Sequence, residues 1–148
     1  MPESLEDRLR RIEDLLEIQQ LFVDYIEYLD TADLDGYAGL FAEDGEVLLA
    51  PGARAKGHEE IKALIARIVP GQTGNAYHIV SSPIIHLDGD RATAQVMWTV
   101  IAKDAEGKPT VTMLGRHLDE LVREHGHWRI QRRKGRLDIP SGIPTRAE

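Results

Sequence analysis

Apolar side chains recur at steps of three and four residues through the N-terminal part of the chain, with charged and amide side chains between them. This spacing is that of one face of an α-helix. It predicts a long amphipathic helix over residues 5–29, whose apolar positions are Leu5, Leu9, Ile12, Leu15, Leu16, Ile18, Phe22, Tyr25, Ile26 and Leu29. Asp33 is a good N-cap for a second, short helix that carries Leu34, Tyr37, Leu40 and Phe41. Asp30 is therefore expected at a junction between two helices.

Turn signals divide the next part of the chain. Asp44-Gly45 and Pro51-Gly52 bound a predicted short strand over residues 46–50. A third helix is expected to begin at Gly57 and to end at Pro70-Gly71, because its apolar positions Ile61, Leu64, Ile65 and Ile68 form one stripe.

From residue 77 onwards the apolar pattern changes to the alternation of β-strands. Four strands are predicted over residues 77–87, 91–102, 110–123 and 127–138, separated by Gly-containing turns. Three helices followed by long strands predict an α+β cone, in which a curved, mostly antiparallel sheet wraps around the helices and encloses a central pocket. We expect a single domain over residues 1–139 and a loose C-terminal tail over residues 140–148.

Composition narrows the functional classes. The net charge of −7 disfavours nucleic-acid binding, and the basic residues between Arg129 and Arg136 are interpreted mostly as solvated charges on a strand. The absence of cysteine excludes disulfides, thiolate nucleophiles and Cys-ligated metals. The N-terminus does not resemble a signal peptide, and no apolar stretch approaches the about 20 residues that span a bilayer. These features predict a cytoplasmic protein without membrane contact.

Common cofactor and metal motifs are missing from the sequence. It contains no Gly-rich phosphate loop, no Gly-x-Ser-x-Gly motif and no His-Glu-x-x-His motif. His125 and His127 are closely spaced, but a predicted exposed turn without a third ligand is a poor metal site. We predict neither a cofactor nor a metal.

Asp30 and His78 form the best candidate for chemistry. Each has an ordinary structural interpretation, since Asp30 could cap a turn and His78 could be a buried structural histidine. Together they could form a dyad, in which the aspartate accepts the Nδ1 proton of the imidazole, fixes its tautomer and leaves Nε2 as a general base.

Several motifs resemble the SnoaL-like branch of the NTF2-like superfamily over about residues 8–138. They are Tyr25-x-x-x-x-Asp30-x-x-Asp33, Leu40-Phe41-x-x-Asp44-Gly45, Gly57, Tyr77-His78, Leu87-Asp88-Gly89-Asp90, Gly115-Arg116-His117-x-Asp119 and Gly126-x-Trp128-Arg129-Ile130. The resemblance implies that Asp30 orients His78 as the base. It also implies that Tyr25 donates a hydrogen bond to substrate, although a core tyrosine is an equal alternative.

The resemblance further implies an arginine from the last strand in the pocket. The family pattern points to Arg133, whereas simple alternation with Trp128 and Ile130 points to Arg132. A β-bulge would favour Arg133. His117 stands where many relatives have tyrosine, so it either lines the pocket or packs on the sheet.

Two functions fit these observations. The first is a cofactor-independent lyase or isomerase, dehydratase-like or cyclase-like, that acts on a small, hydrophobic, cyclic molecule. The alternative is a noncatalytic ligand-binding or assembly module, which predicts a shallow or filled cone and a packed histidine distant from Asp30. In either case we expect a homodimer, because the sheet face away from the helices would otherwise expose Val, Ile and Trp side chains.

Overall fold

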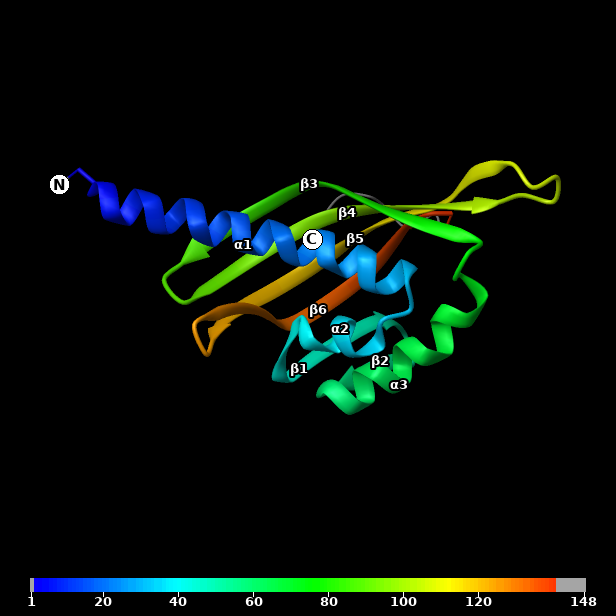
Figure 1. Cartoon of the computed structure of the whole chain (residues 1–148), viewed down its shortest axis with the longest axis horizontal. Coiled ribbons are helices and arrows are strands. Elements are labelled where there is room, and N and C mark those ends of the chain that lie inside the picture. Colours follow the sequence, from blue (N-terminus) through cyan, green and yellow to red (C-terminus); the bar gives the residue numbers. More distant parts are fainter. Residues whose placement is uncertain (1, 141–148) are drawn as a thin grey trace.

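The computed structural model describes residues 2–140, so the predicted tail lies outside the described residues from position 141 onwards (Figure 1). Its helices are α1 (Leu5–Asp30), α2 (Leu34–Gly39) and α3 (His58–Ile68), followed by one 3₁₀ turn, Val69–Gly71. Its strands are β1 (Phe41–Ala50), β2 (Ala53–Lys56), β3 (Ala76–Asp88), β4 (Arg91–Lys103), β5 (Pro109–Glu124) and β6 (His127–Ile139).

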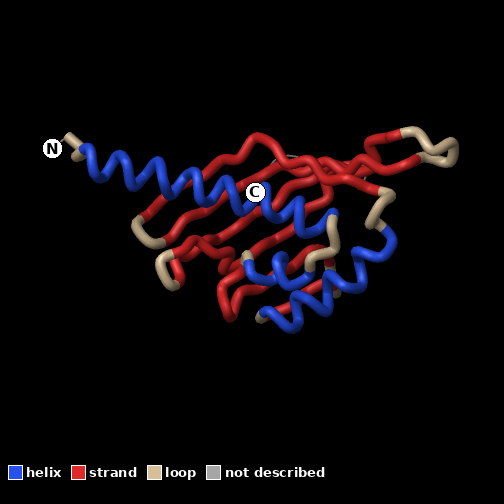
Figure 2. The backbone as a smooth tube through the Cα atoms, in the orientation of Figure 1, coloured by secondary structure: helices blue, strands red, loops and turns tan. Residues whose placement is uncertain are grey.

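The strands form one sheet in the order β2-β1-β6-β5-β4-β3. The β1–β6 pair is parallel and all other neighbours are antiparallel. Figures 1 and 2 show the three helices gathered on one face of the curved sheet. The predicted α+β class, with a mostly antiparallel sheet around N-terminal helices, is confirmed.

The junction between α1 and α2 is held by side-chain and backbone caps. The Thr31 amide donates to the Glu27 carbonyl oxygen, and Ala32 takes a left-handed conformation with φ of 60°. Asp33 then caps α2 by accepting a hydrogen bond from the Gly36 amide at 2.8 Å. Asp30 is thus the last residue of α1, as the pattern predicts.

The N-terminal turns of α1 depart from the predicted amphipathic stripe. Ile18, Phe22 and Tyr25 are buried against the sheet, but Leu9 and Leu16 are exposed. Figure 1 shows that the first turns of α1 extend past the β3–β4 turn, where the sheet gives them no surface to pack against. Leu16 lies further along the helix, and it is exposed because its neighbours Asp14 and Ile18 face the sheet and it lies on the opposite side. Within residues 2–140, no helix is both long and apolar enough to span a membrane.

The segment after α2 is more extended than predicted. Phe41, which the apolar pattern places in the second helix, begins β1 instead, and β1 has ten residues. The Pro51-Gly52 turn then leads into β2, a strand that the sequence pattern did not predict. Leu40 and Phe41 are both buried, so an apolar pair alone does not distinguish the end of a helix from the start of a strand.

A bulge in β6 decides which arginine faces inwards. Ile130 pairs with Leu121 and Arg132 pairs with Glu120, so Gln131 is an extra residue on β6. The alternation therefore changes phase after Ile130. Arg133 lies on the inner face and is fully buried, whereas Arg132 is exposed.

Candidate active site

Asp30 and His78 lie in direct contact at the end of α1 and the start of β3. Nδ1 of His78 is 2.7 Å from Oδ1 of Asp30. The other carboxylate oxygen accepts a hydrogen bond from the His78 backbone amide at 3.2 Å. One carboxylate thus holds both the main chain and the ring of the same histidine, although the two residues are 48 positions apart.

This contact assigns the two nitrogens of the imidazole. An ionised carboxylate is only an acceptor, so Nδ1 carries the hydrogen and donates it to Asp30. Nε2 forms no hydrogen bond with any residue in the described part of the chain. It is therefore available to accept a proton, and the resulting imidazolium would be stabilised by the adjacent carboxylate. The C-terminal end of α1 adds negative potential at the same place.

His78 lines a cavity of about 270 Å³ between the helices and the inner face of the sheet. Most of its wall is apolar, with a few polar side chains placed among the apolar ones. The lining residues are Tyr25, Leu29, Tyr37, Leu49, Ala50, Ile65, Ile68, Gln72, His78, Trp98, Met113, His117, Gly135 and Leu137. An apolar pocket with few convergent polar groups is typical of a small-molecule site.

Tyr25 stands at the centre of an aromatic cluster in this wall. Its ring meets His117 edge-on at 5.2 Å between centroids and His78 at 6.4 Å. The ring centroid of Tyr37 lies 6.0 Å from that of Tyr25. Burial raises the pKa of Tyr25, with the neighbouring Tyr37 adding to the effect, so its hydroxyl stays protonated and can donate a hydrogen bond.

His117 also lines the cavity, on β5. It lies between Tyr25 and Trp98, whose ring is 5.9 Å away. Burial lowers its pKa well below the ordinary value, and the positive charge of Arg133 and the nearby His78 lower it further. Its Nδ1 is buried and has no hydrogen-bond partner among the described residues. His117 is therefore a neutral, polar part of the wall.

The two candidate arginines have different positions. Arg133 is bound by Asp119 through two hydrogen bonds of 2.9 and 2.7 Å, and both side chains are fully buried. Although burial acts in the opposite direction, the Asp119 carboxylate raises the pKa of Arg133. The guanidinium lies 4.8 Å from the Tyr25 ring and is not among the lining residues. Arg132 instead pairs with Glu46 at 3.4 Å on the outer side.

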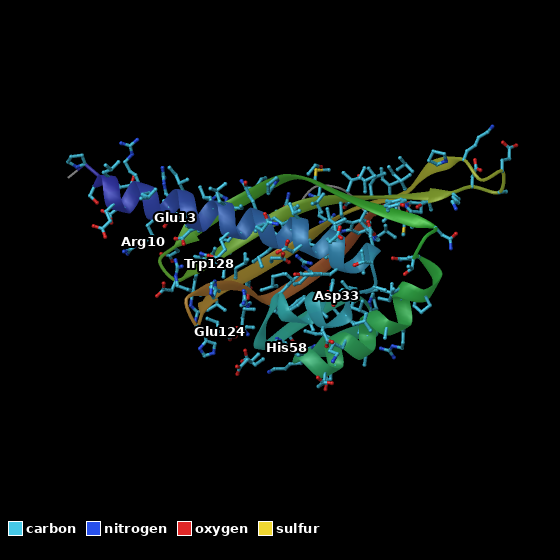
Figure 3. All side chains as sticks on the ribbon, viewed as in Figure 1. Arg10, Glu13, Asp33, His58, Glu124 and Trp128 are labelled. Carbon is cyan, nitrogen blue, oxygen red and sulfur yellow. The ribbon has the colours of Figure 1, made fainter. Side chains whose placement is uncertain are left out.

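The closely spaced histidines near the β5–β6 turn do not act together. Nδ1 of His127 lies 3.4 Å from Oε1 of Glu17, and Nε2 of His125 lies 3.7 Å from Oε1 of Glu43. Among the described residues, Glu43, Glu124 and His125 are close enough to one another to share a cation, but this group lies at the surface, where Figure 3 labels Glu124.

Three residues of the site were not predicted as such from the sequence. Tyr37 and Trp98 line the cavity, and Asp119 anchors Arg133. Tyr37 and Trp98 occupy ordinary core positions of a helix and a strand, and nothing in the sequence separates them from their apolar neighbours. Asp119 could have been found from the sequence, because a carboxylate at an inward-facing position of a strand needs a buried partner.

Comparisons with known proteins agree with this architecture. The SnoaL-like domain family matches residues 10–134. No functionally curated protein matches the sequence significantly. An NTF2-like protein with a cystatin-like fold from Novosphingobium aromaticivorans is 27% identical, with coverage of 95% of this chain and 94% of that chain and a TM-score of 0.86. A protein of unknown function from Mycobacterium tuberculosis is 27% identical, with coverage of 93% of this chain and 79% of that chain and a TM-score of 0.80.

A third solved structure, a candidate scytalone dehydratase from Novosphingobium aromaticivorans, is 24% identical, covers 93% of this chain and 92% of that chain, and has a TM-score of 0.76. At this identity the likeness concerns the fold alone. The family match extends over most of the described chain, and the neighbours share its curved sheet and helices. The chain therefore belongs to the SnoaL-like family and has the NTF2-like fold.

Proposed function

We propose that this protein is a cofactor-independent lyase or isomerase that acts on a small, hydrophobic, cyclic molecule, with His78 as general base and Asp30 as its positioning residue. The observation that carries the proposal is the 2.7 Å contact between Asp30 and His78 at the wall of an apolar cavity. A histidine with one nitrogen bound to a carboxylate and the other open to a cavity has the arrangement of a general base.

The proposed reaction begins with removal of a proton from a carbon next to a carbonyl group. Nε2 of His78 takes the proton, and the electron pair of the broken C–H bond moves into an enolate. If the substrate carries a β-hydroxyl group, the imidazolium returns the proton as the C–O bond breaks, and water and a new double bond result. If it carries a β,γ carbon–carbon double bond instead, the intermediate is a dienolate, the imidazolium returns the proton to the γ carbon, and the product is the conjugated isomer.

Charge on the enolate oxygen needs a hydrogen-bond donor. Tyr25 is our candidate, because it lines the cavity and burial keeps its hydroxyl protonated. Arg133 is held by Asp119 behind the Tyr25 ring, so its charge would act through Tyr25 and not on the substrate directly.

The cavity also supports the substrate class. Its volume of about 270 Å³ is enough for a compact ring system, and aliphatic and aromatic side chains form most of the wall. A noncatalytic assembly module would have no need of an open cavity, and a module that only binds a ligand would have no need of a histidine oriented by a carboxylate. The candidate scytalone dehydratase among the structural neighbours is named for a dehydration, which is one of the two outcomes above.

Hydrogen–deuterium exchange tests the first step without a known substrate. A panel of cyclic ketones is incubated with the protein in deuterated buffer, and loss of the proton next to the carbonyl is followed by NMR. We expect exchange with the native chain and a decrease of about 10²- to 10⁴-fold in H78A. D30N should lose activity to a similar order, because an amide can hold the ring in the wrong tautomer.

H86A is the matched control, since His86 lies on the same strand but outside the cavity. It should exchange at the native rate. If the native chain binds a ketone tightly, as measured by calorimetry, but H78A and D30N exchange protons as fast as it does, the proposed mechanism is wrong.

We also propose a homodimer through the outer face of the sheet. Exposed apolar side chains there include Ile79, Ile84, Met97 and Leu118. The prediction that Trp side chains contribute is wrong, because Trp98 lines the cavity and Trp128 is fully buried on the inner face. In light scattering, M97E should have a lower mean mass than the native chain at the same concentration. An unchanged mass in M97E would contradict this interface.

We propose a cytoplasmic location, which is supported by the cysteine-free composition. Imaging of a fluorescent fusion in the native organism tests it, and a secreted fusion would contradict it.

A further inference from the structure

α1 carries a second row of apolar side chains, which faces away from the sheet over most of its length and ends at Val23, beside Val80 and Ser81 of β3. Leu5 is 78% exposed, Leu9 54%, Ile12 52%, Leu16 60% and Val23 54%. Ile18, Phe22 and Tyr25 of the same helix cover the sheet and are at most 4% exposed. With about 100° of rotation per residue, Leu9 points in the direction opposite to Ile18. We call the five exposed residues the outer stripe.

The outer stripe has the spacing of a coiled-coil seam. Its members follow one another at steps of four, three, four and seven residues, and Gln19 fills the position that divides the last step into three and four. These steps place Leu9, Leu16 and Val23 at the a positions of a heptad repeat and Leu5, Ile12 and Gln19 at the d positions. Such a seam buries its apolar side chains against a second helix with the same pattern.

The charges beside the stripe favour a second copy of the same helix in parallel orientation. Arg8 occupies a g position and Glu13 the e position five residues later, so in a parallel pair each Arg8 meets the partner's Glu13. Both lie on the exposed part of α1, where Figure 3 labels Glu13 and the neighbouring Arg10. Arg10 already pairs with Glu6, whereas Arg8 and Glu13 have no ion-pair partner within residues 2–140.

An antiparallel pair of helices would be less stable, because two of its contacts are unfavourable. It would bring the two Glu13 side chains together, and it would place Gln19 against Leu9. A parallel, in-register pair places Gln19 against its own copy, where two amides can form hydrogen bonds with each other. A single polar layer of this kind also sets the register.

We propose that α1 is a homodimerisation surface, in which the outer stripes of two copies pack as a short, parallel, in-register coiled coil. The helix is already folded on the domain, so association does not carry the cost of helix nucleation. The stripe spans residues 5–23, about 28 Å of helix, so the contact is small and the association reversible. It is separate from the outer face of the sheet and independent of the proposed catalytic function.

Single cysteine variants test the arrangement, because the chain has no cysteine of its own. In L9C and I12C each new thiol would meet its own copy, so mild oxidation should give covalent dimers. R10C is the matched control, since Arg10 lies on the same exposed turns but outside the seam. We expect about tenfold or more dimer from L9C and I12C than from R10C.

The same reagents distinguish the two orientations. An antiparallel pair would cross-link poorly in I12C alone and well in a mixture of I12C with L16C, and this result would overturn the parallel arrangement. Equal yields from R10C and the two seam variants, or no dimer from any of them, would overturn the α1 interface as a whole. The outer stripe would then be a surface that binds a different protein.

A charge reversal gives a second, non-covalent test. It is made in the M97E background, so that the outer face of the sheet does not contribute to the measured mass. By light scattering, R8E should self-associate about fivefold or more weakly, because two attractions become repulsions. R8E combined with E13R should restore the association. Equal association in all three chains would contradict the proposal.

Discussion

Removal of Asp119 would leave the Arg133 guanidinium charged and buried without a counter-ion. Both side chains are 0% exposed, and the two hydrogen bonds between them are 2.9 and 2.7 Å long. When one partner of a buried ion pair is lost, the remaining charge keeps the full cost of its desolvation. We therefore expect D119L to lower the free energy of unfolding by about 3–5 kcal/mol.

Replacing Arg133 as well as Asp119 shows whether the lost stability comes from the missing ion pair or from the isolated charge. The double variant with D119L and R133M has no charge to desolvate, and an apolar pair of similar volume is often as stable as the ion pair it replaces. We expect it to recover most of the stability that D119L loses. R132M is the surface control, because Arg132 is exposed and its contact with Glu46 should contribute less than about 1 kcal/mol.

Urea denaturation followed by circular dichroism measures these differences, and thermal melting gives a second reading. For a chain of this size, a loss of about 3–5 kcal/mol should lower the melting temperature by roughly 6–20 °C. The reasoning fails if D119L costs no more than R132M, or if the double variant is no more stable than D119L alone. A stable double variant would also allow the proton-exchange assay without the Arg133 charge beneath Tyr25.

Three further changes test other parts of the site. The folded-state pKa of His117 lies well below its ordinary value of 6.5, so as the pH falls below 6.5 the unfolded chain binds a proton that the folded chain does not. As the pH decreases, the free energy of unfolding of the native chain should therefore fall more steeply than that of H117F, by up to about 1.4 kcal/mol per pH unit. Urea denaturation at several pH values measures both, and parallel curves would contradict this. G115A should cost about 3 kcal/mol in urea denaturation, because the new Cβ would overlap the Trp98 ring and the Arg136 carbonyl oxygen; native-like stability would show that the strands adapt freely. Y25F should slow proton exchange by about 10²-fold while leaving the fold intact by circular dichroism, and an undiminished rate would remove Tyr25 from the proposed mechanism.

Local signals were sufficient for most of the secondary structure. The long helix, the capping role of Asp33 and the Asp88-Gly89 turn all depend on neighbouring residues, and all are present. Phe41 shows where local signals fail, because an apolar residue is buried equally well in a helix and in a strand. Its pairing with Ile130 on a distant strand makes it part of β1.

The candidate site needed more than local signals. Asp30 and His78 could be chosen from their residue types and a family resemblance, but each had an ordinary alternative. Their contact depends on the C-terminal end of α1 meeting the start of β3, two segments that are 48 residues apart. The sequence alone could not place Tyr37, which the fold of α2 brings to the same cavity.

The sequence by itself determined the periodicities of this protein, because the pitch of a helix and the pleat of a strand depend on consecutive residues. The periodicities determined the α+β class, and residue types together with a family resemblance gave the Asp30 and His78 candidates. Only the tertiary structure decided which side chains face inwards. Alternation along β6 favours Arg132, but the extra residue at Gln131 changes the phase and places Arg133 inside. A bulge forms where two neighbouring strands cannot stay in register, so its position depends on both strands and is not encoded in either alone.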